Sequence, residues 1–160
     1  MSLSTNIADK ALQGLAIIGQ DEQSRKQIIA TLRMIEGRHA SQGFNVRNEV
    51  TGPIVDALHR DTDVLCVRLL QGVDYYFRYQ GNIHRELVMS PEENPDHVWE
   101  PQTTRLLLHL ACGATNVVIG GAYSGDHALL IAHSLQGKGT VFCFEPNSAE
   151  RGQLEYNAIE

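Results

Sequence analysis

The period at which apolar residues recur changes along the chain, and it divides the sequence into three regions. In residues 1–60 apolar positions recur every three or four residues, as on one face of a helix. From residue 61 they form strand-like runs rich in aromatic and β-branched side chains. From residue 116 short apolar runs flank a helical pattern. We therefore predict an α/β protein with a helical region (1–60), a β-hairpin with lead-in helices (61–115) and a βαβ region (116–160).

Three helices are predicted in the first region. The first follows an N-cap at Ser4 or Thr5, the second covers 21–40, and the third starts near Pro53. The residues expected to face inward are Ile7, Ala11, Leu12 and Leu15 in the first helix, Ile28, Leu32 and Ile35 in the second, and Ile54, Ala57 and Leu58 in the third. Two interpretations stay open for this layer. It covers a substrate or an oligomer interface, or it simply packs on the domain.

A β-hairpin is predicted next, with strands at 64–70 and 73–79 and a turn at Gln71-Gly72. Its tyrosines either line a cleft or pack within the sheet. A short helix at 83–89, a loop at 91–95 and a helix at 102–110 follow. The core candidates of the last helix are Leu106, Leu107 and Leu110.

The region 116–145 contains a βαβ unit. The apolar runs 117–119 and 141–144 have the composition of fully buried parallel strands. A glycine-rich loop, 120–125, follows the first strand and leads into a helix. The second strand ends at a single acid, Glu145.

This βαβ unit predicts a nucleoside site. Glycines after a strand let main chain approach a ligand closely, and the following helix presents free N–H groups. Glu145 lies twenty positions after Gly125, about where βαβ nucleotide sites place the acid that accepts the ribose hydroxyls. We expect an adenosine-containing ligand there.

Composition narrows the classes of partner. The 160 residues are 42% hydrophobic and 20% charged, which suits one globular domain. A net charge of −6 argues against nucleic acid, and no apolar run reaches the length of a membrane span. Three widely spaced cysteines, Cys66, Cys112 and Cys143, are expected to be buried free thiols in a reducing compartment. We expect a cytoplasmic protein without a membrane partner.

The seven histidines do not predict a metal site. No pair has the i, i+4 spacing of a helical zinc motif, so no metal is expected. His127 is the one histidine beside the glycine loop, where it would be able to contact a ligand.

Three short motifs resemble the family of FkbM-type S-adenosylmethionine-dependent methyltransferases. Gly121, Ala122 and Gly125 match the loop of that family, Phe144-Glu145-Pro146 match its Phe-Glu-Pro element, and Leu154-x-x-Asn157 match its third element. The similarity covers roughly residues 62–160. Two positions depart from the family pattern, since Ile119 stands where the family has Asp and Tyr123 where it has Asn.

The resemblance implies a Rossmann-like class I methyltransferase domain that binds S-adenosyl-L-methionine. It assigns the cofactor contacts to Gly121, Ala122, Tyr123, Gly125, Glu145 and Pro146. The implied reaction is O-methylation of a sugar or secondary-metabolite hydroxyl, with a small-molecule or carbohydrate acceptor. No catalytic base is assigned.

The family domain has further strands beyond those seen here. The chain is therefore expected to hold about half of such a domain. It is a fragment of a longer protein, completes its sheet with the hairpin, or pairs with another chain. A homo-oligomer formed through the helical N-terminus is a further predicted assembly.

Two other functions stay open. Gly120-x-Ala122-x-x-Gly125 is a degenerate form of the dinucleotide fingerprint, which predicts an NAD(P)-dependent oxidoreductase. The third reading is a non-catalytic assembly domain. The Phe-Glu-Pro and Leu-x-x-Asn elements favour the methyltransferase over the oxidoreductase, because they have no special meaning in a dehydrogenase.

Overall fold

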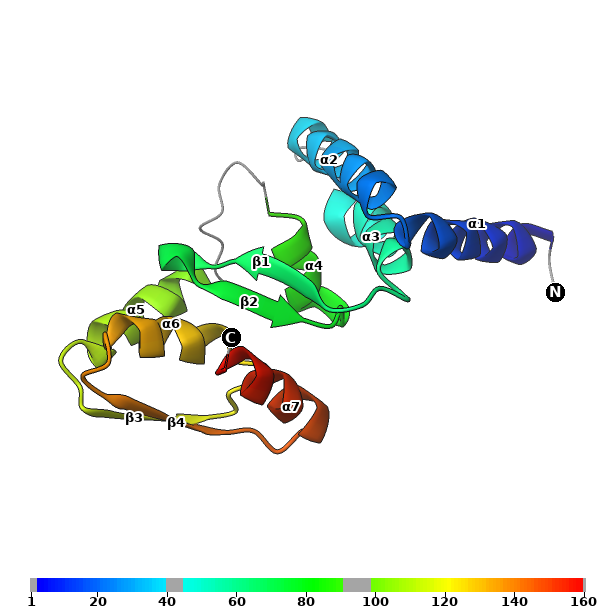
Figure 1. Cartoon of the computed structure of the whole chain (residues 1–160). Helices are drawn as coiled ribbons and strands as arrows, with labels where there is room; N and C mark the ends of the chain where they lie inside the picture. Colours follow the sequence, from blue (N-terminus) through cyan, green and yellow to red (C-terminus); the bar gives the residue numbers. More distant parts are fainter. Residues whose placement is uncertain (1–2, 40–44, 91–98, 160) are drawn as a thin grey trace. The chain divides into compact units, whose positions relative to one another are not determined.

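The computed structural model describes residues 3–39, 45–90 and 99–159. The chain is mixed α/β and 61% helical. The described elements, shown in Figure 1, are α1 (Leu3–Gly19), α2 (Glu22–His39), the π-helical turn η1 (Arg47–Thr51), α3 (Gly52–Leu58), β1 (Leu65–Arg68), the 3-10 turn η2 (Leu70–Gly72), β2 (Asp74–Phe77), α4 (Gly81–Val88), α5 (Pro101–Ala111), β3 (Asn116–Gly120), α6 (Asp126–Ser134), β4 (Thr140–Phe144) and α7 (Ser148–Asn157). The predicted loop at 91–95 lies outside the described residues.

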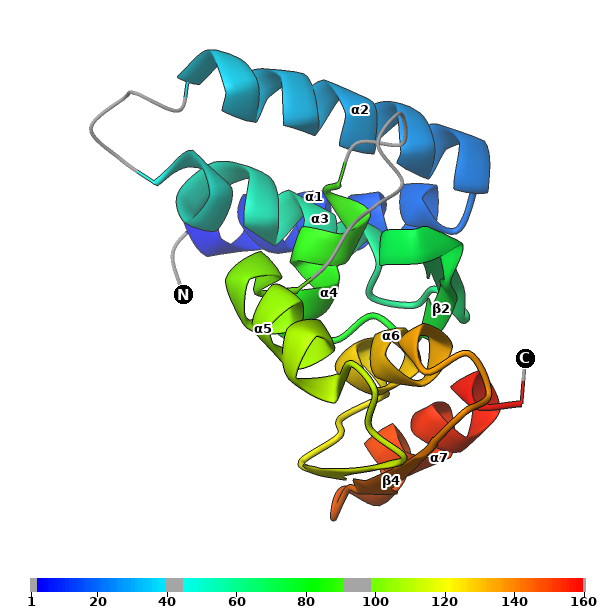
Figure 2. The same ribbon diagram turned by 90° about the vertical axis from the view of Figure 1, so that its left-hand side faces the viewer.

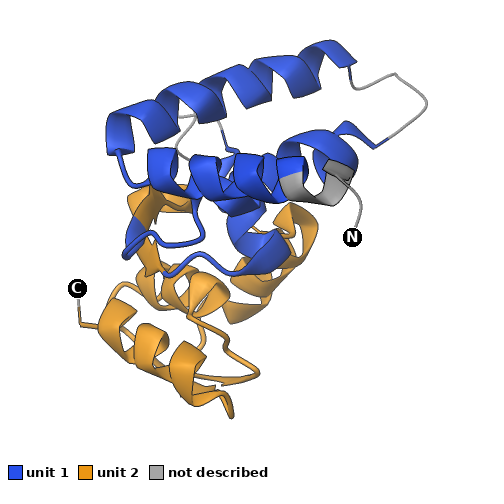
Figure 3. Cartoon of the chain, turned by 90° about the vertical axis from the view of Figure 1, so that its right-hand side faces the viewer, with its two compact units in different colours: residues 1–65, 78–91 blue, residues 66–77, 92–160 orange. Residues whose placement is uncertain are grey.

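The chain forms two compact units, and each is built from two separate segments. Unit 1 comprises residues 1–65 and 78–91, and unit 2 comprises 66–77 and 92–160 (Figure 3). The hairpin therefore belongs with the βαβ region, and α4 belongs with the N-terminal helices. The division into 1–60, 61–115 and 116–160 stays a prediction about sequence regions.

Unit 1 is a helical layer with one apolar core. Ile29 and Leu32 of α2 pack with Val55 and Leu58 of α3, and Met89 after α4 completes the cluster. Figure 2 shows α2 alongside α1 and α3. The three helices predicted in this region are confirmed.

The predicted inward face of α1 is only partly right. Ile7 is 70% exposed and Ala11 is exposed, whereas the buried side of α1 carries Ala16 and Gly19. Gly19 is required there, since a Cβ at this position would lie 1.8 Å from the carbonyl oxygen of Leu58. The ends of α1 and α3 thus touch main chain to main chain, which only glycine permits.

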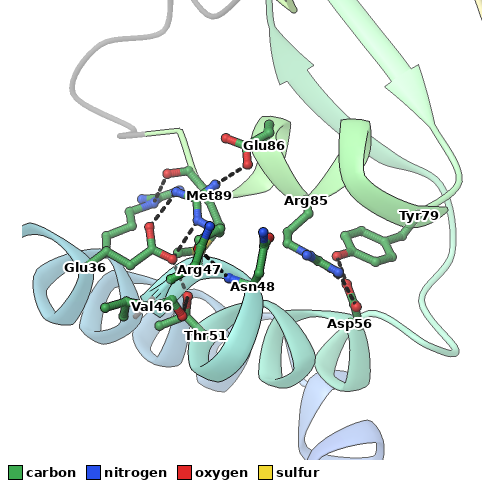
Figure 4. Close-up of polar contacts among 12 residues, drawn as sticks. Glu36, Val46, Arg47, Asn48, Thr51, Asp56, Tyr79, Arg85, Glu86 and Met89 are labelled. Atoms are coloured by element: carbon green, nitrogen blue, oxygen red, sulfur yellow. Dashed lines mark hydrogen bonds and ion pairs between the residues drawn. The ribbon is translucent and has the colours of Figure 1, made fainter. Parts of the chain in front are cut away.

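Charged side chains tie the helices of unit 1 together (Figure 4). The carboxylate of Glu36 on α2 accepts a hydrogen bond from Arg47 Nε at 2.6 Å and another from the Thr51 hydroxyl. The same guanidinium reaches Glu86 on α4, with 2.6 Å between Nη1 and Oε1. Arg47 therefore joins α2 to α4.

A second ion pair joins α3 to α4 in the same unit. Arg85 donates through Nε to Asp56 Oδ1 at 3.0 Å and through Nη2 to Asp56 Oδ2, a two-point geometry. The Tyr79 hydroxyl donates to Asp56 Oδ1 as well (Figure 4). Asp56 is thus the common acceptor for both partners.

The hairpin of unit 2 has the predicted turn but shorter strands. Gln71 and Gly72 have φ of 66° and 79°, a left-handed conformation typical of tight hairpin turns. β1 and β2 have four residues each instead of the seven predicted. Beyond β1, Leu69 still pairs across the hairpin through its amide, which donates to the carbonyl of Val73, and the turn η2 then takes up Leu70. Inside the hairpin, the fully buried rings of Tyr75 and Phe77 stack at 5.5 Å, which favours the packing interpretation.

Strands β3 and β4 pair in parallel, as predicted, with Val117 opposite Val141 and Gly120 opposite Phe144. Ile131 and Leu135 pack against one face of this sheet. The other face was predicted to be buried, and this is wrong for the described residues. Val118 and Phe144 are 69% and 63% exposed, because no described element covers that face.

The hairpin does not extend the parallel sheet. Among the described residues β1–β2 and β3–β4 are separate two-stranded sheets, so completion of the parallel sheet by the hairpin is excluded.

The core prediction for α5 is wrong in part. Leu106 and Leu110 are exposed, whereas Leu107 packs against the core as predicted. The inward face of α5 also carries Thr104, Leu108 and Ala111. Those positions follow the i, i+3, i+4, i+7 spacing of a single helix face.

Candidate functional site

The ends of β3 and β4 bring the glycine loop, residues 121–125, beside Glu145. Because the strands are parallel and Gly120 is opposite Phe144, both chains leave the sheet at the same edge. The amides of Gly121 and Ala122 both donate to the carbonyl of Phe144, at 2.8 and 3.2 Å. The loop is therefore held against the end of β4.

The carboxylate of Glu145 points at the glycine loop. Its Oε2 accepts a hydrogen bond from the amide of Tyr123 at 2.9 Å, and its Oε1 accepts one from the amide of Asn147 at 2.8 Å. A carboxylate has about four acceptor positions, so two main-chain bonds leave room for two ligand hydroxyls. Glu145 is thereby fixed in orientation and remains half-buried.

The loop has a left-handed backbone at three positions. Gly121, Tyr123 and Gly125 have φ of 75°, 50° and 103°. Tyr123 is the exception, because a bulky residue seldom adopts this conformation unless its surroundings hold it there. The hydrogen bond from its main-chain amide to the carboxylate of Glu145 supplies one such restraint.

The six predicted cofactor residues differ in their contacts and in their exposure to solvent. Tyr123 and Glu145 are in direct contact, while Gly121 and Pro146 are exposed beside them. The side chain of Ala122 is buried in an apolar cluster with Ala128 and Leu154.

Gly125 has a packing role that the sequence did not reveal. A Cβ there would lie 2.7 Å from Leu154 Cδ1, so the glycine lets α7 approach the loop. Its main chain begins α6.

Two buried acids, Asp126 and Glu150, lie close to the loop. Their burial was not predicted from the sequence. Burial raises the pKa of Asp126, in the first turn of α6, and the negative charge of Glu100 adds to this. Burial also raises the pKa of Glu150, against a hydrogen bond from Ser124 that lowers it. Tyr123 lies near both acids. Burial, followed by Glu150 and Asp126, raises its pKa to about 12. Burial is therefore the main cause that raises the pKa of all three groups.

The loop is also bonded to strand β2, which lies far away in sequence. The hydroxyls of Tyr75 and Ser124, both fully buried, share a hydrogen bond. The side chain of Asn157 bonds to the carbonyl of Ser124 at 2.9 Å. Asn157 belongs to the Leu-x-x-Asn match, whereas Tyr75 and Ser124 carry no local sequence signal.

The described contacts of the His127 imidazole are with residues at the start of α5. Its Nε2 lies 3.1 Å from the hydroxyl of Thr104 and 3.3 Å from the carbonyl of Trp99, at the start of α5. It therefore joins α6 to α5.

The three cysteines are free, but their predicted burial is wrong for two of them. Cys66 and Cys112 are exposed and Cys143 is half-buried. Within the described ranges, no group of three or more His, Cys, Asp or Glu side chains could hold a metal ion. No described helix is long and apolar enough to cross a membrane.

No known family model, curated protein or solved structure matches this chain.

Proposed function

We propose that the chain binds S-adenosyl-L-methionine at the glycine loop and Glu145 and serves S-adenosylmethionine-dependent methyl transfer. The observation that carries the proposal is the bond between Glu145 Oε2 and the amide of Tyr123. This hydrogen bond orients the carboxylate at the edge of the sheet where both parallel strands end. Open α/β sheets bind nucleotides at that edge.

The residues present suit an adenosyl ligand. Glu145 would accept the two ribose hydroxyls, and the main chain of residues 121–125 would lie along the methionine part. When bound, the cofactor supplies an activated methyl group. The protein contributes by binding and orienting this donor against an acceptor.

The proposed fold context is the first half of a Rossmann-like class I domain. The sequence β3–α6–β4, with its parallel pairing and its acid after β4, supports this assignment. Its resemblance to FkbM-type enzymes favours a hydroxyl acceptor on a sugar or secondary metabolite.

Calorimetric titration of the whole chain tests the proposal. Binding heat with S-adenosylmethionine and S-adenosylhomocysteine, but not with NAD, is the expected result. Heat with NAD alone would instead support an oxidoreductase, and absence of heat with all three ligands would support an assembly domain.

Glu145→Ala sharpens this experiment. Loss of the ribose contacts is expected to weaken binding of S-adenosylhomocysteine by about ten- to a hundredfold, at ~1.4 kcal/mol per decade. The matched control is Glu155→Ala, on the exposed surface of α7, which should leave affinity unchanged. Equal affinity in both variants would refute the ribose assignment.

A further inference from the structure

The side chain of Asn157 substitutes for a neighbouring strand beside β2. Its Oδ1 accepts from the amide of Tyr76 at 2.9 Å, and its Nδ2 donates to the carbonyl of Tyr76 at 2.8 Å. This is the reciprocal pairing that a peptide group makes across a sheet. The Asn157 side chain is 5% exposed, so these bonds are shielded from water.

The same amide group also holds the glycine loop. Its second N–H donates to the carbonyl of Ser124 at 2.9 Å. Ser124 lies between Tyr123, whose amide contacts Glu145, and Gly125, which begins α6. The orientation of the peptide group at 124–125 is therefore set by a side chain on α7.

A second bond connects the same partners. The hydroxyl of Tyr75, next to Tyr76 on β2, bonds to the hydroxyl of Ser124. Two consecutive residues of β2 are thus linked to Ser124. Tyr75 bonds to it directly, and Tyr76 is linked to it through the side chain of Asn157.

We propose that Asn157 is a positioning residue that couples the glycine loop to the β1–β2 hairpin, so that a nucleoside bound at the loop also steadies β2. This inference rests on the proposed function for its ligand. Its chemistry requires an amide, because the group donates twice and accepts once at a buried point. A carboxylate of the same shape would keep the acceptor but face two carbonyl oxygens without a proton to donate.

Asn157→Asp is the decisive variant, and Asn116→Asp on the exposed start of β3 makes the same chemical change as a control. Leu135→Ala, in the apolar cluster under α6, supplies a variant destabilised without touching these bonds. Amide hydrogen exchange is measured on each variant of the whole chain, with and without S-adenosylhomocysteine. The two amides followed are Tyr76, which donates to Asn157, and Gly125, which belongs to the peptide group that Asn157 holds through the Ser124 carbonyl.

In the unsubstituted protein, S-adenosylhomocysteine is expected to slow exchange at Tyr76, although Tyr76 is not assigned to the site. In Asn157→Asp this protection should disappear, and binding should weaken by about tenfold. Asn116→Asp and Leu135→Ala should keep the protection. If Leu135→Ala loses protection and affinity as Asn157→Asp does, Asn157 has only a structural role and the proposal is wrong.

Exchange without ligand separates the two proposals. Faster exchange at both Tyr76 and Gly125 in ligand-free Asn157→Asp, but not in Asn116→Asp, supports the positioning role even if no adenosyl ligand binds. Unchanged exchange in the ligand-free variant overturns the coupling, whether or not the ligand binds.

Discussion

The phenol ring of Tyr79 stacks on the imidazole of His59, with ring centroids 4.7 Å apart and planes 16° apart. His84 lies on another side of the same phenol, at 6.4 Å. Both histidines are almost fully buried in unit 1. His59 Nδ1 bonds to the carbonyl of Val55 at 2.9 Å, and His84 Nδ1 accepts from the amide of Gln80 at 2.7 Å. Unit 1 thus holds two imidazoles in places suited to their neutral form.

This arrangement predicts loss of stability in mild acid. Burial is the main cause that lowers the pKa of both His59 and His84 from 6.5 to about 4. Above pH 6.5 both are neutral whether folded or unfolded. Between pH 6.5 and 4 the unfolded chain takes up protons that the folded chain does not, so the free energy of unfolding falls as pH falls. Urea unfolding at a series of pH values measures this decrease.

His59→Gln, which keeps an N–H donor near the Val55 carbonyl, should flatten the pH dependence. The matched control, His133→Gln on the exposed side of α6, should leave its slope unchanged. A slope that is the same in both variants would show that His59 titrates normally in the fold.

The Asp56–Arg85 pair should contribute measurably to stability. The Arg85 side chain is only 12% exposed, so Asp56→Ala leaves a buried guanidinium and the Tyr79 hydroxyl without their acceptor. We expect a loss of about 1–3 kcal/mol in the free energy of unfolding. Glu22→Ala removes the corresponding partner of Lys26, a pair that is 68% and 60% exposed, and should change stability little. Denaturation of both variants under the same conditions gives the comparison, and equal effects would contradict it.

Gly125→Ala should be more harmful than Gly137→Ala. Both glycines have positive φ, but only at 125 would a Cβ meet another side chain, that of Leu154. We expect a loss of about 2–4 kcal/mol at 125, from strain and overpacking together. At 137, where nothing lies within 4 Å, strain alone should cost about 1–2 kcal/mol. Thermal unfolding of the two variants tests which one loses more stability. A larger loss in Gly137→Ala than in Gly125→Ala would contradict the prediction.

Local periodicity was sufficient to predict the helices α1 to α6, the strands β1 to β4 and the position of Glu145 at the end of β4, whereas α7 was expected only from the family resemblance. The stripe on α2 and the apolar runs of β3 and β4 each reflect contacts made within one element or to its nearest neighbour. The approach of Glu145 to the loop follows from parallel pairing, since two short strands joined by a helix must end at one edge.

Burial could not be predicted in the same way. An apolar run indicates that two faces can be buried, but not that a neighbouring element exists to cover both. Val118 and Phe144 are therefore exposed in spite of their composition. The contacts of Tyr75 with Ser124 and of Tyr76 with Asn157 were missed for a different reason. Their separations of 49 and 81 residues leave no periodic trace in the sequence.

The discontinuous construction of both units sets an order on biosynthesis. As the chain leaves the ribosome, the amide of Tyr76 emerges 81 residues before the Asn157 side chain that pairs with it. Unit 1 obtains α4 only after the hairpin segment 66–77 has been made. One edge of β2 therefore stays open until translation reaches α7. In a nascent chain stalled before α7, that strand edge would be accessible to chaperones.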